Sequence, residues 1–536
     1  MRPFVAVARS GMKKRFFHSP RLLGNKRNNQ KKGRFRMKNL ALDAFFQKME
    51  ADGMALAFKD VRLKSGYSQV LPPEVSVRTQ FSRKVTLNSP VVSAAMDTVT
   101  ESTMAIAMAK AGGIGVIHRK FATPAQQAEE VERVKLYLNA IISKPICVYE
   151  DDTIETIESL REEKMYSFQS FPVLNRQGRL IGLLTRNDFD LCQNVCLPAR
   201  EAMTQKLITA PVGTTLVQAY ALMIKEKKKV LPITDTEGKV TGMYIFSDVK
   251  RVMEGNSQSY NIDSAGHLRV AAAIGTGDSA LGRATLLANA SVDVIVIDTA
   301  HGDSKPVFET LKEIKRAFPD IDVVVGNVSE GASAKRLVDA GADGIKVGQG
   351  SGSICTTRMV AGIGCPQVTA IYNCAKAIQD SGVPVCADGG IEYSGDITVA
   401  IGAGAHSVML GNLLAGTEET PGEIITIDDM RYKHYRGMGS LGVMIESRES
   451  RNRYGQTNLG KDKLVPEGVE GAVPCKGPVE KSLYQYVGGL RSGMGYVGAR
   501  TIEELQEKAD FYRISSAGLA ESHPHNIRIV KDAPNY

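Results

Sequence analysis

"VDVIVIDT", residues 292–299, is an apolar run interrupted near its start by Asp293 and closed by Asp298. Such runs are typical of strands buried on both faces of a parallel sheet. Amphipathic stretches separate this run from others like it, so the pattern predicts an α/β fold, specifically an eight-stranded (β/α)8 or TIM barrel. The other runs span 89–96, 113–118, 269–275, 322–328, 342–348, 383–390 and 406–411.

The carboxyl ends of barrel strands form the active-site face in this fold. In this chain those ends carry Asp298, Asn327, Gly348, Asp388 and Gly411. We therefore expect these residues to share one site.

About 150 residues separate the second and third runs, too many for one barrel helix and its loops. Within them, 145–189 and 206–249 share one order of strand, helix, strand, glycine turn and strand. This repeat predicts a tandem module inserted in the barrel. It resembles paired cystathionine-β-synthase-type (CBS) domains, which bind purine nucleotides in many proteins; a purely structural appendage is the alternative. The predicted division is a leader at 1–36, barrel at 37–143, CBS-type module at 144–253 and barrel at 254–536.

The formal charge of +9 arises in the leader, which holds twelve Lys/Arg and no Asp/Glu. The remainder carries −3 and offers no broad basic surface, so we expect no specific nucleic-acid partner. Three interpretations of the leader stay open: a solvated disordered tail, an organelle presequence, or translation from upstream of a true start at Met37.

Apolar runs and cysteines limit the environment of the chain. No run reaches the roughly 18 to 20 residues of a membrane span, which predicts no integral insertion. The eight cysteines show no short-spaced framework. We expect a reducing compartment, the cytoplasm, although the leader leaves an organelle possible.

"GQGSGSICTTR", residues 348–358, places a cysteine in a glycine-rich loop. Its glycines allow positive φ and close approach of the backbone to a ligand. Cys355 is followed by Thr356, Thr357 and Arg358, an electropositive setting that would favour the thiolate and suit a nucleophile. The alternative is a small buried apolar side chain.

Two further glycine-rich stretches, 387–396 and 409–417, follow the seventh and eighth runs. Barrels of this class often hold a phosphate there on backbone N–H groups. Asp388 is placed to accept hydrogen bonds from sugar hydroxyls, so we expect a phosphorylated ribose whose base lies near Cys355. Glycines that serve only as barrel turns are the alternative.

Several long motifs, in order, resemble the IMP dehydrogenase / GMP reductase family from about Met37 to Tyr536. They are SAAMDTVTE (93–101), GSGSICTTRMVAGIGCPQ (350–367), ADGGIEYSGD (387–396), YRGMGSLG (435–442), NRYGQ (452–456), KLVPEGVEG (463–471) and ESHPH (521–525). The resemblance implies NAD-dependent oxidation of IMP to XMP, the committed step of guanine nucleotide (GMP) biosynthesis within purine biosynthesis. It proceeds through a thioimidate on cysteine that is then hydrolysed.

The resemblance also assigns roles to residues. The catalytic set is Cys355, Thr357, Arg453 and Tyr454. The IMP contacts are Ser353, Asp388, Gly390, Gly411, Asn412, Tyr435, Gly437, Met438, Gly439 and Glu467. The NAD side is Asp298, Asn327 and Gly348. Two departures stand out: Asn412, where many relatives have Ser, and Gly455, where the family has Phe.

The polar segment 447–463 by itself predicts a disordered loop. The resemblance implies instead a mobile flap, about 431–470, that enters the vacated dinucleotide site and brings Arg453 and Tyr454 to activate water. It also implies a K+ site and a homotetramer, because the C-terminal segment of a neighbouring subunit completes the cation site. The cation ligands would be Gly350, Gly352, Cys355, Glu521, Ser522 and His523.

Two rival functions remain. A GMP reductase shares the barrel, Cys355 and Thr357, but it runs an NADPH-dependent deamination without hydrolysis, so it has no use for Arg453 and Tyr454. A nucleotide-sensing CBS protein with an inert barrel is the second rival. The intact set of Cys355, Asp388, Arg453 and Tyr454 argues against it.

Overall fold

The structure is a computed structural model. It describes residues 39–137, 141–142, 145–163, 166, 168–192, 194–253, 259–531 and 533. The leader and the candidate start at Met37 lie outside the described residues.

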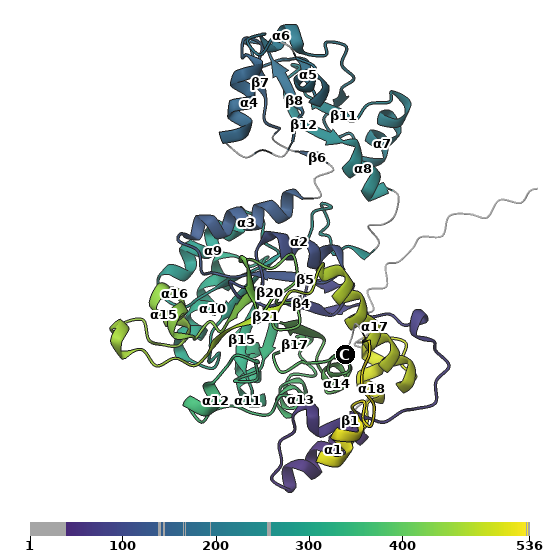
Figure 1. The fold of residues 1–536 in the computed structure, drawn as a ribbon, viewed down its shortest axis with the longest axis vertical. Coiled ribbons are helices and arrows are strands. Elements are labelled where there is room, and N and C mark those ends of the chain that lie inside the picture. Colours follow the sequence, from purple (N-terminus) through teal and green to yellow (C-terminus); the bar gives the residue numbers. More distant parts are fainter. Residues whose placement is uncertain are drawn as a thin grey trace, which may run out of the picture. The chain divides into compact units, whose positions relative to one another are not determined.

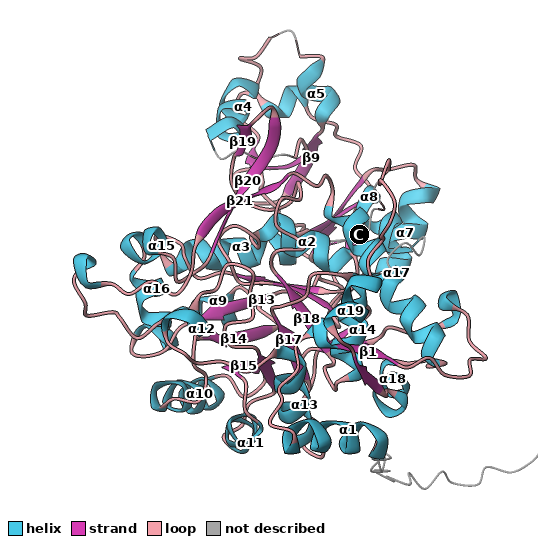
Figure 2. Ribbon diagram, turned by 60° about the horizontal axis from the view of Figure 1, so that its bottom comes forward, coloured by secondary structure: helices cyan, strands magenta, loops and turns pink. Residues whose placement is uncertain are grey.

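Eight parallel strands close into a barrel in the order β13-β14-β15-β16-β17-β18-β4-β5, with helices around them (Figures 1 and 2). Every run that the sequence predicts as a barrel strand contains one of these strands, so the predicted (β/α)8 fold is confirmed. The strands are β4 (Val91–Ser93), β5 (Ile114–Ile117), β13 (Ala271–Ile274), β14 (Val294–Asp298), β15 (Asp322–Val328), β16 (Gly344–Val347), β17 (Val385–Asp388) and β18 (Ser407–Leu410).

Side-chain alternation along the strands builds two apolar cores. Successive residues of a strand point to opposite faces. In β14, Val294 and Val296 belong to the interior core of the barrel, whereas Ile295 and Ile297 belong to the larger core shared with the helices. The helices that follow barrel strands are α2 (Ser102–Lys110), α3 (Pro124–Leu136), α9 (Ser279–Asn289), α10 (Lys305–Ala317), α11 (Gly331–Asp339), α12 (Thr357–Val360), α13 (Gln367–Ala377) and α14 (Ser394–Gly402).

The two ends of the described chain meet in one small sheet. β1 (Val61–Leu63) pairs antiparallel with β22 (Phe511–Arg513). The other terminal elements are α1 (Leu40–Ala51), η1 (Phe58–Asp60), η2 (Pro72–Glu74), β2 (Thr79–Gln80), β3 (Thr86–Leu87), α17 (Val479–Val497), α18 (Ile502–Lys508) and α19 (Ser516–Glu521).

The predicted repeat has the expected order of elements in both copies. The first strand of each copy pairs parallel with the second, which pairs antiparallel with the third. Each copy packs its own apolar cluster. The boundaries of the module stay a prediction. Its elements are β6 (Ile141–Ile142), β7 (Val148–Tyr149), α4 (Ile154–Glu163), β8 (Phe171–Leu174), β9 (Leu180–Leu184), α5 (Arg186–Asp190), α6 (Ala199–Ala202), β10 (Ala210–Pro211), α7 (Leu216–Lys225), β11 (Val230–Thr234), β12 (Val240–Ile245) and α8 (Phe246–Met253).

A three-stranded antiparallel sheet carries the predicted flap. It comprises β19 (Ile424–Ile427), β20 (Met430–Arg436) and β21 (Glu470–Pro474). Between β20 and β21 lie α15 (Leu441–Glu446), α16 (Arg448–Arg453) and η4 (Lys461–Lys463). The expectation of a disordered loop at 447–463 is therefore wrong for α16, whose N-terminus is capped by the Ser447 hydroxyl accepting from Ser450 N at 3.3 Å.

Within the part of the chain that the structure describes, no helix combines the length and apolarity needed to cross a membrane.

Candidate active site

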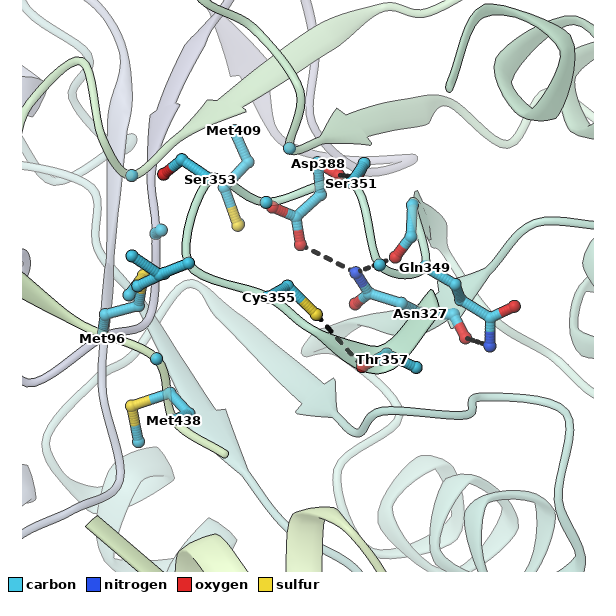
Figure 3. A pocket seen from close by; sticks show the side chains of 18 of the residues that line it. Met96, Asn327, Gln349, Ser351, Ser353, Cys355, Thr357, Asp388, Met409 and Met438 are labelled. Carbon is cyan, nitrogen blue, oxygen red and sulfur yellow. Dashed lines mark hydrogen bonds between the residues drawn. The ribbon is translucent and has the colours of Figure 1, made fainter. Parts of the chain in front are cut away.

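The carboxyl ends of the barrel strands surround a cavity of about 200 Å³ (Figure 3). All residues that the sequence assigned to a site line it, except Gly439, Glu521, Ser522 and His523. Those that line it are Asp298, Asn327, Gly348, Gly350, Gly352, Ser353, Cys355, Thr357, Asp388, Gly390, Gly411, Asn412, Tyr435, Gly437, Met438, Arg453, Tyr454 and Glu467.

Cys355 presents its thiol to this cavity. Its Sγ lies 3.1 Å from Thr357 Oγ1 (Figure 3). The Glu467 carbonyl lies 3.7 Å from the same Sγ. Two backbone bonds fix the loop against the second half of the flap: Thr356 N donates to Glu467 O at 3.0 Å, and Val469 N donates to Ile354 O at 3.0 Å. The thiol is thus held at a defined place beside a hydroxyl.

The burial of Cys355 differs from that of the structural cysteines. Cys374 and Cys386 are buried, and burial raises the pKa of the Cys386 thiol to about 12. Cys355 is only half-buried and lines the cavity. This position favours a reactive thiol over the alternative of an inert apolar side chain.

Arg358 does not supply the positive charge expected beside Cys355. Its Nε donates to Gln349 O at 3.1 Å, and its Nη2 donates to Cys365 O. A Cβ at Gly350 or Gly364 would come within 2.5 or 2.8 Å of the Arg358 Cγ. These two glycines make room for the Arg358 side chain, which joins both ends of the loop. The position of Arg358 in the sequence, three residues after Cys355, did not show that its side chain binds these carbonyls.

A buried lysine organises the polar wall of the cavity. Lys346 is 1% exposed, and its Nζ lies 2.7 Å from Asp388 Oδ2 and 3.0 Å from Asp298 Oδ1. It also donates to Asn327 Oδ1. Asn327 Nδ2 in turn donates to Asp388 Oδ2 at 2.9 Å and to Gly348 O at 2.6 Å. One ammonium therefore orients two carboxylates and an amide toward the cavity.

The sequence assignments missed Lys346. The signal was present, because a lysine interrupts the otherwise apolar strand β16, residues 344–347. A lysine is almost never fully buried unless it is paired. A charged residue in the middle of a barrel strand thus indicates that polar partners surround it inside the barrel.

The flap reaches the same cavity from outside the barrel. Arg453 Nη1 forms an ion pair with Asp298 Oδ2, and Arg453 O accepts from Ala300 N at 3.2 Å. The Arg453 Nε is buried without a hydrogen-bond partner among the described residues. Burial raises the pKa of the Tyr454 phenol, which keeps that hydroxyl protonated. Gly439 lies behind this ring, since a Cβ there would come within 2.5 Å of Tyr454 Cζ.

The opposite side of the cavity is built for close backbone approach. Gly389 and Gly390 have φ values of 94° and 80°, a region that favours glycine. Tyr435 hydrogen-bonds Ser353, and burial raises the pKa of Tyr435 to about 12, so its hydroxyl is a neutral donor. This hydroxyl would lie 2.9 Å from a Cβ at Gly411, which leaves room only for glycine there.

The predicted C-terminal cation ligands do not line the cavity in this chain. Glu521 ends α19, and the His523 ring centroid is 5.8 Å from that of Tyr393. Among the described residues, no group of three or more His, Cys, Asp or Glu side chains is placed to hold a metal ion. A potassium site built from carbonyls stays a prediction.

Known proteins resemble this chain over most of its length. Residues 55–525 match the IMP dehydrogenase / GMP reductase domain. The chain is 52% identical over 485 residues to the inosine-5′-monophosphate dehydrogenase of Aquifex aeolicus, covering 90% of this chain and 97% of that one. It is 46% identical over 482 residues to the enzyme of that name from Halalkalibacterium halodurans, covering 90% and 98%.

A solved structure shares the fold as well. It is a GMP reductase variant from Trypanosoma brucei in complex with guanosine 5′-monophosphate, with a TM-score of 0.83 and 37% identity. The match covers 89% of this chain and 100% of that one. Together with the matched domain and the curated relatives, it shows that this chain belongs to the IMP dehydrogenase / GMP reductase family.

Proposed function

We propose that this chain oxidises IMP to XMP with NAD, through a covalent intermediate on Cys355. The observation that carries the proposal is the meeting of two reactive groups in one cavity. Cys355 lies beside Thr357 on the barrel, and the flap brings Arg453 and Tyr454 to the same space. A nucleophile and a water-activating pair are what a two-step oxidation and hydrolysis requires.

The first step is attack of the Cys355 sulfur on C2 of the purine, which turns a flat aromatic carbon into a tetrahedral hydride donor. Thr357 Oγ1, 3.1 Å from Sγ, is placed to accept the thiol hydrogen bond and to pass its own hydroxyl proton to the purine ring, so that it relays the thiol proton to the nitrogen that gains charge. NAD, when bound, accepts the hydride that leaves C2. The thioimidate that remains on Cys355 is then open to water, and its hydrolysis frees XMP and restores the thiol.

The polar wall suits a nucleoside monophosphate. Asp388, oriented by Lys346 at 2.7 Å, keeps carboxylate oxygens for ribose hydroxyls. Ser353, Gly390, Gly411 and Asn412 supply N–H and side-chain donors for the phosphate. The purine edge would meet Met438, Gly439 and Glu467, and Tyr435 and Gly437 complete the assigned IMP contacts; all of these except Gly439 line the cavity.

The dinucleotide and the closed flap compete for Asp298 in this scheme. Asp298, Asn327 and Gly348 offer a carboxylate, an amide and a bare backbone for the nicotinamide ribose. Arg453 pairs with the Asp298 carboxylate here. Hydride transfer therefore belongs to the open flap and hydrolysis to the closed one.

Arg453 and Tyr454 are assigned to water activation. A guanidinium is a poor base because its pKa exceeds about 12 in solution. The Arg453 side chain is, however, largely buried, paired with Asp298 on one side and close to Tyr454 on the other. Its unpartnered Nε supplies a donor that a water or substrate atom could satisfy.

The test is a pair of assays on the purified chain. We expect NADH and XMP from IMP with NAD, and no IMP from GMP with NADPH. The second candidate, a GMP reductase, is favoured by the solved relative of that name. It predicts the opposite pattern, and the presence of Arg453 and Tyr454 argues against it.

The finer assignments belong to the same proposal. K+ would bind the carbonyls of Gly350, Gly352 and Cys355; Gly352 O accepts the Cys355 N–H at 3.0 Å and keeps a second lone pair. Glu521, Ser522 and His523 of a neighbouring subunit would complete the site in a homotetramer. The CBS-type module would bind purine nucleotides as effectors, and the cytoplasm is the proposed compartment.

A further inference from the structure

The flap helix α16 carries two side chains of opposite charge, one helical turn apart, and both form ion pairs with residues of the barrel. Arg453 pairs with Asp298 at the end of β14. Glu449, four residues earlier and about 6 Å along the helix, pairs with Arg119 at 3.2 Å and with Arg283 at 3.1 Å. The helix therefore carries a cation toward a carboxylate and an anion toward two guanidiniums.

The two arginines form a buried guanidinium pair with more donors than partners. Each is 4% exposed. Arg283 Nη1 donates to Gln127 Oε1 at 2.9 Å and to the Arg119 carbonyl at 3.3 Å. Arg119 Nη1 reaches Glu449 Oε2 and Asn452 Oδ1, whereas its Nη2 is buried without any hydrogen-bond partner among the described residues. A buried donor of this kind marks a place where a further acceptor fits.

The charges around the pair do not balance without the flap. Among the described residues, Glu449 is the one carboxylate that forms an ion pair with either guanidinium. The neighbouring cation Lys120 is committed elsewhere, to Asp97 and Glu446 at 2.8 Å each. Burial lowers the pKa of Arg119 to about 10, so it stays charged at neutral pH. When α16 leaves, two buried cations lose their anion, an arrangement that is strongly unfavourable unless another anion replaces it.

The pair lies next to the proposed dinucleotide site. A Cβ at Gly275, which follows β13, would collide with the Arg119 guanidinium, so Arg119 lies at the carboxyl end of that strand. β13 and β14 are neighbours in the barrel, and Asp298 ends β14. Neighbouring strands lie about 4.8 Å apart. A ligand that reaches Asp298 with a ribose can thus reach Arg119 and Arg283 with its next group.

We infer that Arg119 and Arg283 form the subsite for the diphosphate of the dinucleotide, and that Glu449 occupies this subsite when the flap is closed. The inference rests on the proposed function. It adds that the Glu449 carboxylate of the flap and the diphosphate of the ligand are anions that bind the same two arginines. Planar guanidiniums recognise phosphate oxygens by paired hydrogen bonds. Glu449 is thus more than a flap anchor, because it neutralises the same groups that hold the ligand.

Two purine-free fluorescent probes test the subsite, so that purine binding at the CBS-type module does not interfere. They are reduced nicotinamide mononucleotide, which carries a phosphate, and reduced nicotinamide riboside, which does not. In Glu449→Gln protein with bound IMP, we expect the mononucleotide to bind about tenfold more tightly than the riboside. Adding Arg119→Gln should reduce this ratio to about twofold or less without weakening the riboside.

Controls separate the subsite from flap opening in general. Glu446→Gln and Lys120→Gln remove a different ion pair between flap and barrel, so they should raise the affinity for both probes alike and leave their ratio unchanged. Arg283→Gln is the second variant if Arg119→Gln fails to fold. If the affinity ratio of mononucleotide to riboside stays near tenfold after either arginine is replaced, the inference is wrong. The ratios need no turnover, so a chain that forms no XMP yet shows them contradicts the proposed reaction and still supports the subsite.

Discussion

Arg453 of the flap helix and Asp298 of strand β14 form an ion pair at the carboxyl end of the barrel. The same carboxylate lies 3.0 Å from the Lys346 ammonium. Asp298 is therefore held between a fixed cation of the barrel and a cation of the flap, and a ligand that needs this carboxylate has to displace Arg453. The order of the two chemical steps follows from this exchange in our scheme.

Cys355→Ala should abolish NADH formation from IMP, by at least about 1,000-fold, because no other described cysteine lines the cavity. The dissociation constant of IMP should stay within about threefold, since most of its proposed phosphate and ribose contacts, namely Asp388, Gly390, Gly411 and Asn412, lie on other loops. Cys365→Ala is the matched control, because that thiol lies near the same loop outside the cavity and should leave turnover intact. Substantial NADH formation by Cys355→Ala would refute the nucleophile.

Lys346→Met should lower the free energy of unfolding by about 3 to 5 kcal/mol, because it removes the buried cation that pairs with Asp388 and with the buried Asp298. It should also lower kcat/KM, since Asp388 and Asp298 lose their orientation. Lys315→Met removes a more exposed lysine, whose Nζ lies 2.7 Å from Asp343, and should cost about 1 kcal/mol. Urea unfolding and steady-state kinetics measure both, and wild-type values for Lys346→Met would contradict the network.

Docking of α15 should weaken only in acid. The hydrogen bond from Lys120 lowers the pKa of Glu446 below its ordinary 4.5. A carboxylate with a lowered pKa stabilises the docked state fully above that ordinary value, and its contribution is lost as the pH falls through the lowered one. Hydrogen exchange of α15 amides, corrected for the intrinsic effect of pH, should be constant from pH 7 to about 5 and should rise below about 4.

Glu446→Gln provides the control for that measurement. It should show faster exchange at neutral pH and a weaker acid response, since the titrating group is gone. Loss of protection already between pH 7 and 5 would show that another group governs docking.

Deleting residues 144–253 should leave a folded and active barrel. The two apolar clusters of the module draw their members from residues 141–253, so the barrel core loses none of its own. Thermal unfolding should stay cooperative, and kcat should stay within about threefold. Any effect of purine nucleotides on activity should vanish. An insoluble or inactive product would place the module within the folding unit of the barrel.

The sequence was enough to predict the barrel, because strands buried on both faces are written as apolar runs. It also predicted which ends of those strands carry the site. The sequence did not predict the partners of buried charges. Lys346 stands out within its strand, but the neighbouring residues in the sequence do not show that it pairs with both Asp298 and Asp388. These contacts join residues far apart in the chain.

The short helix α16 was missed for a related reason. A segment of 6 residues is too short to be helical through its own propensity. Its stability comes from tertiary contacts, above all those of Glu449 with Arg119 and Arg283. The direction of Arg358, bound to carbonyls at both ends of its loop, was likewise set by tertiary structure.

The most direct test of the two-step mechanism is rapid mixing of Arg453→Ala with IMP and NAD, followed at the NADH absorbance band and by intact-protein mass. Hydride transfer depends on Cys355 and bound NAD, so a burst of about one NADH per active site should survive. Hydrolysis needs activated water, so steady-state XMP release should fall at least about 100-fold while the adduct on Cys355 accumulates. Arg448→Ala, an exposed side chain on the same helix, should behave as the unmodified chain. Loss of the burst together with the steady state would place Arg453 before hydrolysis and contradict the account, as would an Arg453→Ala enzyme that turns over normally.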